Sequence, residues 1–226
     1  MKDMDQMGVI FDLDGILVDS YRAHLESWQS LAREYGTAMT EAQFASLFGR
    51  TSPDIIREVW DSVSHDQVLA MAERKEALYR EILDRNFPAM DGARELIDQL
   101  VEKNFVLAVG SSGPPQNVEL SLQKLGRRKH FSAVITGRDV TRGKPDPQVF
   151  LTAAQRMDLE ASQCAVIEDA PAGISAARAA GMTSIALTGT APADKLRHAD
   201  LVVKSLRELT PEKIARLIRI KERRRE

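Results

Sequence analysis

The sequence predicts an α/β fold in which helices cover both faces of a parallel sheet and a helical segment is inserted after the first strand. Short apolar, β-rich runs recur along the chain, and helical patterns separate them. Near-continuous apolar strands that alternate with helices are typical of a buried, doubly wound parallel sheet. The interval between the first run and residue 104 contains no convincing strand, which indicates an insertion.

The first strand is expected at residues 8–11, where GVIF precedes an aspartate. The remaining strands are expected at 105–110, 132–136, 164–167 and 184–187, and the helices between them at 91–104, 114–126, 145–157 and 173–181. The insertion shows helical patterns near 19–35, 40–48, 53–63 and 65–86 and ends at Pro88. We therefore expect a core made of residues 1–18 and 89–226 and a helical domain at 19–88. The basic end of the chain, KIARLIRIKERRRE, is expected to form a solvated helix.

Composition narrows the function. The chain has 226 residues, of which 43% are apolar, and its length lies near the ~250 residues beyond which chains divide into several cores. The net charge of −2 and the 5% aromatic content give no electrostatic footprint for nucleic acid. Cys164 has no partner for an internal disulfide, the N-terminus is charged, and no apolar stretch approaches ~18 residues. We expect a cytoplasmic protein, a monomer or small homo-oligomer, that binds a small phosphorylated metabolite and neither nucleic acid nor membrane.

Polar side chains follow four of the expected strands. Ligands of open parallel sheets collect outside the carboxyl ends of the strands, so these side chains are candidates for a site. Carboxylates, hydroxyls and a lysine together suit a phosphate and a hard cation. The candidates are Asp12 and Asp14 after the first strand, Ser111 and Ser112 after the second, Lys144 in the loop after the third, and Glu168 and Asp169 after the fourth.

Each candidate has a chemical role open to it. Asp12 can attack phosphorus to form an aspartyl-phosphate, and Asp14 can transfer protons to the leaving oxygen and from water. Ser111 and the N–H groups after it can hold phosphoryl oxygens, and Lys144 can supply positive charge. Several carboxylates in one place repel one another unless a cation lies among them, which points to magnesium. Pro145 disfavours helical geometry at Lys144, so a helix capped by Asp146 is expected to begin at Pro147.

Ordinary structural explanations exist for each candidate taken alone. Aspartates and serines cap turns after strands, a loop lysine is common, and two acidic residues often begin a helix. Their occurrence together, in order, at four strand ends favours the catalytic interpretation. Two other motifs fail on spacing, since Gly15 comes too early for an EF-hand loop, and Pro145 stands where a P-loop has serine or threonine.

Four segments carry a resemblance to a known family. DLDGILVDS, VGSS, RGKPDPQVF and VIEDAPAGISAARAAGM resemble, in order, the four motifs of the haloacid dehalogenase-like (HAD) hydrolases. The resemblance implies a Rossmann-like core, and the insertion is similar to the cap of the subgroup that includes phosphoglycolate phosphatase, sugar-phosphate phosphatases and β-phosphoglucomutase. It implies that Asp12 is the nucleophile, Asp14 the acid/base, and Ser111, with Ser112 beside it, and Lys144 the phosphate ligands.

The same resemblance implies a magnesium ion. Asp12, the main-chain carbonyl of Asp14, and Asp169 would hold it, with Glu168 nearby as a further ligand. Ile16 stands where many members have threonine, which removes no catalytic group.

Within the insertion, three residues are candidates for substrate contact. His24 and Lys75 lie on apolar helical stripes and match substrate-side residues of β-phosphoglucomutase. Packing roles are equally open to both. Where the mutase has Gly-x-x-Arg, this chain has Gly49 and then Ser52, and its arginine is Arg50. Arg50 could meet an anionic substrate or pair with a carboxylate of the cap.

The sequence thus predicts a magnesium-dependent phosphatase that hydrolyses a sugar phosphate or phosphoglycolate through an aspartyl-phosphate. A β-phosphoglucomutase-type transfer is the first alternative. His24 and Lys75 favour it, and the absent clamp arginine opposes it. A catalytically silent binding protein on the same fold is a third interpretation, which the intact set of acidic residues opposes. A dehalogenase is disfavoured because hydrolysis of a carbon–halogen bond needs no magnesium site and the resemblance to dehalogenases would lack Asp14. Phosphonate hydrolysis is disfavoured because Lys75 lies late in the cap for the Schiff-base lysine of that reaction.

Overall fold

The structure, a computed structural model, describes residues 6–223, and the chain divides into two compact units. One unit, called the core below, comprises Met1–Asp19 and Ala89–Glu226, and the other, called the cap, comprises Ser20–Pro88. The chain leaves and re-enters the core side by side, because the N–H of Met90 donates to the carbonyl of Leu17 (3.1 Å). The last three residues of the basic C-terminal segment lie outside the described residues.

A six-stranded sheet forms the centre of the core. Its order is β3-β2-β1-β4-β5-β6, and every pairing is parallel. From β1 the chain adds strands on one side as far as β3 and then returns to add β4, β5 and β6 on the other, so the predicted doubly wound sheet is confirmed. The strands are β1 (Gly8–Phe11), β2 (Val106–Gly110), β3 (Phe131–Ile135), β4 (Cys164–Glu168), β5 (Thr183–Leu187) and β6 (Leu201–Val203).

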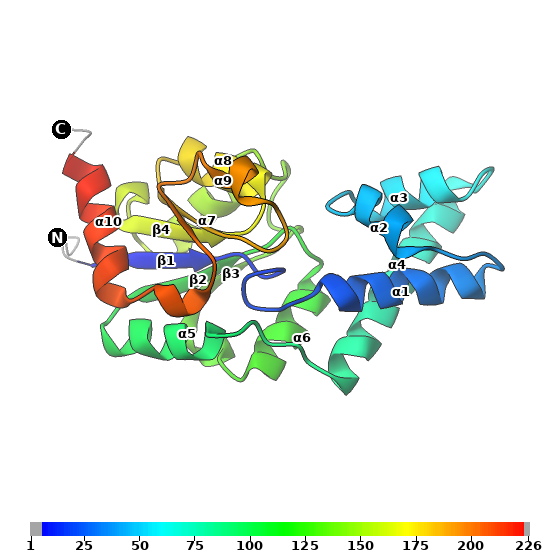
Figure 1. Cartoon of the computed structure of the whole chain (residues 1–226), viewed down its shortest axis with the longest axis horizontal. Coiled ribbons are helices and arrows are strands. Elements are labelled where there is room, and N and C mark those ends of the chain that lie inside the picture. The colour runs from blue at the N-terminus through cyan, green and yellow to red at the C-terminus, as the bar shows by residue number, and fades with distance from the viewer. Residues whose placement is uncertain (1–5, 224–226) are drawn as a thin grey trace. The chain divides into compact units, whose positions relative to one another are not determined.

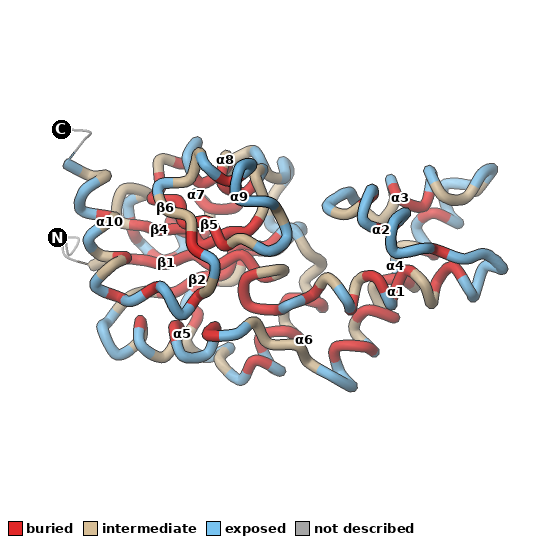
Figure 2. The backbone as a smooth tube through the Cα atoms, viewed as in Figure 1, coloured by how far each residue is buried: buried red, intermediate tan, exposed pale blue. Residues whose placement is uncertain are grey.

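Helices cover both faces of this sheet (Figure 1), with α7 and α8 on one side and α5 and α6 on the other. Apolar side chains of β1, β2 and β4 pack against α7 and α8 in one buried cluster, which includes Ile10, Ala108 and Val166. Figure 2 shows that buried segments concentrate along the strands and the inner sides of the helices. The core helices are α5 (Ala93–Glu102), α6 (Pro115–Leu125), α7 (Gln148–Arg156), α8 (Pro171–Ala179), α9 (Ala193–Leu196) and α10 (Pro211–Arg223).

Two expectations for the core need correction. The helix expected to begin at Pro147 begins at Gln148, with Pro147 as its N-cap. Asp146 still binds the first turn, since its Oδ1 accepts the N–H of Gln148 (3.0 Å). The basic C-terminal helix, α10, is solvated on one face only, because Ile214 and Ile218 are buried against the core. Among the described residues, no helix has the length and apolarity that crossing a membrane requires.

The cap is a bundle of four helices, α1 (Tyr21–Glu34), α2 (Glu41–Leu47), α3 (Ser52–Val59) and α4 (His65–Arg85). Thr40, Thr51 and Ser64 cap the last three, each accepting a backbone N–H with its hydroxyl oxygen. Apolar stripes on the helices meet in a cluster that includes Trp28 and Leu31. The cap therefore has a hydrophobic core of its own.

This separate core makes the stability of the cap measurable. Both tryptophans of the chain, Trp28 and Trp60, lie in the cap, so their fluorescence reports its unfolding in urea. Leu31 is fully buried, and we expect Leu31→Ala to lower the free energy of unfolding by about 3 kcal/mol. Leu69 is exposed, and Leu69→Ala should change it by less than about 0.5 kcal/mol. Equal effects of the two variants would contradict the packing described for the cap.

Candidate active site

The candidate site begins where β1 and β4 end next to each other. Phe11 and Ile167 are partners in the parallel register, so Asp12 follows β1 beside Glu168, the last residue of β4. The N–H of Asp12 donates to the carbonyl of Ile167 (2.9 Å) and extends the pairing by one residue. Sheet register therefore places two carboxylates together, and Asp169 follows directly.

Lys144 joins these carboxylates from the loop between β3 and α7. Its Nζ lies 2.6 Å from Oδ1 of Asp12 and 2.8 Å from Oε1 of Glu168. The lysine side chain is 10% exposed, and its Nζ also lies 4.9 Å from the ring centroid of Phe150. The ammonium is thus held by two charged partners in a site with little water, where such contacts are strong.

Both carboxylate oxygens of Glu168 accept hydrogen bonds. Oε1 accepts from Lys144, and Oε2 accepts the N–H of Ala170 (2.6 Å), just before α8. Helix α8 approaches so closely that a Cβ added at Gly173 would lie 1.8 Å from Oε1 of Glu168. A glycine is therefore required at this position of the helix.

A second glycine makes room for Asp169. Gly15 has φ +77°, and a Cβ there would lie 1.9 Å from Oδ2 of Asp169. The same carboxylate accepts a hydrogen bond from the side chain of Thr190, in the loop after β5. Sequence reasoning did not assign roles to Gly15, Gly173 or Thr190; the glycines lie inside quoted motifs, but the contact that each one permits is not a sequence pattern.

The remaining core candidates lie around this cluster. Ser111 follows β2 and is buried, and its Oγ accepts the N–H of Gly113 (3.0 Å). Ser112, the next residue, is exposed. Asp14 is half-buried in the loop after β1 and contributes an electrostatic repulsion to Asp12. Among the described residues, the group whose carboxylate oxygens lie within 4.8 Å of one another consists of Asp12, Glu168 and Asp169.

Burial shapes the electrostatics of the cluster. Loss of water raises the pKa of Asp12 to about 7, although Lys144 opposes the shift, and burial likewise raises the pKa of Asp169. Burial by itself would lower the pKa of Lys144, but attraction to Asp12 and Glu168 outweighs it and raises the pKa. Three carboxylates against one ammonium leave two uncompensated negative charges when all are ionised. A divalent cation would balance them, so the donor set fits a hard metal ion.

In the cap, two of the three candidate side chains lie together. Nζ of Lys75 is 2.9 Å from Nδ1 of His24, and the His24 ring stacks on Tyr79 with centroids 4.1 Å apart. Lys75 also contacts Glu76. Arg50 instead forms an ion pair with Glu58. Sequence reasoning missed Glu76, which lies outside the apolar stripe of α4.

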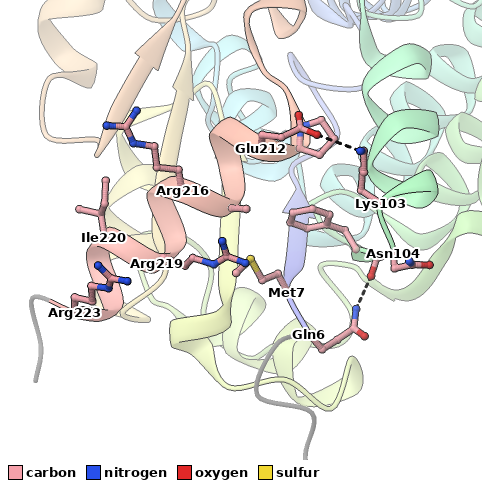
Figure 3. Close-up of a pocket in the computed structure, with 12 residues that line it drawn as sticks. Gln6, Met7, Lys103, Asn104, Glu212, Arg216, Arg219, Ile220 and Arg223 are labelled. Atoms are coloured by element: carbon pink, nitrogen blue, oxygen red, sulfur yellow. Dashed lines mark hydrogen bonds and ion pairs between the residues drawn. The ribbon is translucent and has the colours of Figure 1, made fainter.

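A pocket of about 790 Å³ lies at the opposite edge of the sheet (Figure 3). Met7 precedes β1 and Phe105 precedes β2, so the pocket opens at the amino ends of the strands. Helix α10 forms its other wall with exposed arginines, which include Arg216 and Arg219. None of the candidate catalytic residues lines this pocket.

A parallel sheet that presents carboxylates and a lysine at its strand ends, with a helical insertion after its first strand, is the architecture of an α/β enzyme. The family model described as haloacid dehalogenase-like hydrolase matches residues 9–187. The chain belongs to this family, in the subgroup of β-phosphoglucomutase-like and phosphoglycolate phosphatase-like members with a helical cap. The expected family and enzyme class, a HAD phosphatase or hydrolase, are confirmed.

The proteins that are similar to this chain align with nearly its whole length. Validoxylamine A 7'-phosphate phosphatase of Streptomyces hygroscopicus subsp. limoneus is 37% identical over 88% of this chain and 94% of its own. β-Phosphoglucomutase of Bacillus subtilis is 30% identical over 90% of this chain and 92% of its own. The crystal structure of a family IA, variant 3 HAD hydrolase from Entamoeba histolytica superposes with a TM-score of 0.86, at 29% identity over 95% of this chain and all of that one.

The close approach at Gly15 yields a prediction. In Gly15→Ala the new methyl group must displace the carboxylate of Asp169, and we expect kcat/KM for an aryl phosphate to fall by about 100-fold. Gly126 has a similar φ of +75° with open space around it, so Gly126→Ala controls for backbone strain. Equal losses in both variants would show that strain alone is responsible.

Proposed function

We propose that this chain is a magnesium-dependent phosphatase that hydrolyses a phosphorylated sugar or a related small metabolite. The observation that carries the proposal is the buried contact of Lys144 with Asp12, the residue that the family resemblance makes the nucleophile. Relatives named as sugar-metabolite phosphatases support the substrate class. They include hexitol phosphatase A of Escherichia coli, which is 32% identical over 90% of this chain, and a phosphorylated carbohydrates phosphatase of Thermotoga maritima, which is 30% identical over 78%.

Asp12 and Asp169 would hold the magnesium ion, together with the main-chain carbonyl of Asp14. When bound, the ion neutralises the carboxylates and polarises the phosphoryl group. Both oxygens of Glu168 already accept hydrogen bonds, from Lys144 and from Ala170. We therefore assign Glu168 to positioning Lys144, with metal ligation as its secondary role.

The reaction would proceed in two displacements at phosphorus. A carboxylate oxygen of Asp12 forms a bond to phosphorus as the ester oxygen departs, and Asp14 gives its proton to that oxygen. Water then attacks the aspartyl-phosphate, Asp14 takes a proton from it, and inorganic phosphate leaves with the carboxylate of Asp12 restored. Burial of Asp12 withholds water from its carboxylate, which leaves the ionised form poorly solvated until substrate and cation bind.

Positive groups at neighbouring strand ends would bind the phosphoryl oxygens. Lys144 already lies beside Asp12, so its ammonium would contact the transferred group directly. The Ser111 hydroxyl, which accepts the N–H of Gly113, would donate a hydrogen bond to a phosphoryl oxygen, and the N–H of Ser112 would add a further donor. In the cap, His24, Arg50 and Lys75 would contact the remainder of the substrate.

Transfer of the phosphoryl group between sugars is a second candidate function. The contact between His24 and Lys75 and the resemblance to β-phosphoglucomutase of B. subtilis favour it. Ser52 in place of the clamp arginine opposes it. The products distinguish the two functions, since hydrolysis releases inorganic phosphate and transfer yields an isomer.

The test is phosphate release from a panel of sugar phosphates and phosphoglycolate, with β-glucose 1-phosphate assayed in parallel for glucose 6-phosphate. We expect release that requires magnesium, stops with EDTA, and falls by at least about 1,000-fold in Asp12→Asn.

Asp19→Asn provides the matched control, because Asp19 is an exposed aspartate close to the same loop, and it should retain wild-type rates. Isomer without free phosphate would establish the transferase instead. Release that survives in Asp12→Asn would overturn the proposed nucleophile.

A further inference from the structure

The pocket at the amino ends of the strands lies between two fixed parts of the core. Helix α10 forms one wall, and the segment 103–105, which leads into β2, forms the other (Figure 3). Ile214 and Ile218 anchor α10 on its buried side. Lys103 joins the two walls through an ion pair with Glu212 of α10 (3.4 Å). The pocket is therefore preformed, as small-molecule sites usually are.

The charge of the pocket comes from the arginines of α10. Arg216, Arg219 and Arg223 line it and are exposed, and none of them forms an ion pair with another residue of the range 6–223. Among the described residues that line the pocket, the carboxylate is that of Glu212, which Lys103 already neutralises. Three uncompensated positive charges therefore gather in one pocket of a chain whose net charge is −2.

The spacing of these arginines places like charges beside one another. Residues three and four apart lie on the same side of a helix, so Arg219 neighbours both Arg216 and Arg223. Like charges at this spacing destabilise a helix, and an anion between them relieves the repulsion. Three guanidinium groups spread along about 10 Å of helix suit an anion that carries several charged groups in a row.

Apolar side chains lie beside the charges. Met7 and Phe105 line the pocket and are only half-buried, and Ile220 is 38% exposed. An inorganic anion would leave this apolar surface in contact with water, whereas a ligand with a flat ring would cover it. The volume of about 790 Å³ falls within the ~300–1,000 Å³ of pockets that hold small organic ligands.

We propose that this pocket binds a free nucleoside di- or triphosphate, with the phosphates on the arginines of α10 and the base on Met7, Phe105 and Ile220. A nucleotide combines the two features that the pocket requires, a row of anionic groups and a flat ring. The site is separate from the proposed catalytic function, because none of the candidate catalytic residues lines it. A nucleic acid strand fits less well, since a long polyanion would meet the net negative charge of the rest of the chain.

Isothermal titration calorimetry of the full chain with ATP tests the site. EDTA in the buffer keeps metal out of the candidate catalytic site, where the excess of carboxylates then repels phosphates. We expect ATP to bind at least about tenfold more tightly than inorganic tripolyphosphate, which has the phosphates without the nucleoside, and than adenosine, which has the nucleoside without the phosphates.

Three variants locate the bound nucleotide. Arg216→Gln/Arg219→Gln should raise the Kd for ATP by at least about tenfold, because charged contacts to phosphate are lost. Arg197 is an exposed arginine of the core outside the pocket, and Arg197→Gln should bind ATP like the wild type. Phe105→Leu keeps apolar bulk without the ring, so it should weaken ATP by about threefold or more and leave tripolyphosphate unchanged. Unchanged thermal unfolding verifies the fold of each variant.

Four outcomes would overturn the proposal. Equal affinities of the wild type for ATP and tripolyphosphate would show an unselective basic surface. Tighter binding of an oligoadenylate strand than of ATP would assign the surface to nucleic acid. Absence of ATP binding, or an unchanged Kd in Arg216→Gln/Arg219→Gln, would mean that no nucleotide occupies this pocket. Each of these results is independent of whether the chain hydrolyses phosphate esters, since the titrations are made without metal.

Discussion

The contact of one buried ammonium with two carboxylates is the constraint on which the rest of the core depends. Lys144 comes from the loop after β3, Asp12 from the end of β1, and Glu168 from the end of β4. Nζ of Lys144 nevertheless lies within 2.8 Å of a carboxylate oxygen of each aspartate or glutamate partner. A buried charge is costly unless it is paired and hydrogen-bonded, so Lys144 needs the two carboxylates and each carboxylate needs Lys144. The order β3-β2-β1-β4 is what allows segments so distant in sequence to deliver them to one edge of the sheet.

Close packing around this contact explains residues that perform no chemistry. Helix α8 approaches Glu168 so closely that only glycine fits at Gly173, and the loop after β1 passes Asp169 so closely that only glycine fits at Gly15. Both carboxylates are therefore confined sterically as well as by hydrogen bonds. That confinement keeps like charges near one another in spite of their repulsion, which is the condition for a site that gains a cation and a phosphoryl group together.

Core and cap handle charge in opposite ways. The core leaves negative charge uncompensated at the strand ends, whereas the cap pairs Lys75 with Glu76 and Arg50 with Glu58. On the proposed function, the core would carry out the phosphoryl transfer that is common to all phosphate esters. The cap would contact the alcohol portion, which differs from one ester to another.

The sequence was informative where local pattern determines structure and silent where distant segments meet. Apolar runs predicted five of the strands, but the three residues of β6 are too few to show a pattern. Strand-end position was enough to select Asp12, Lys144 and Asp169 as candidates, because parallel strands deliver their ends to one edge. Periodicity selected Lys75 as a residue on the buried face of α4, and by the same logic it passed over Glu76.

That omission has a physical cause that applies beyond this chain. Helical periodicity ranks positions by the direction of Cβ, and residues 75 and 76 point about 100° apart. A long side chain such as lysine, however, places its charge several ångströms from Cβ, where it can contact an immediate neighbour. The charge that a ligand meets therefore depends on where the side chains end, and Ser52, which binds Glu76 from another helix, determines that end point from 24 residues away in sequence.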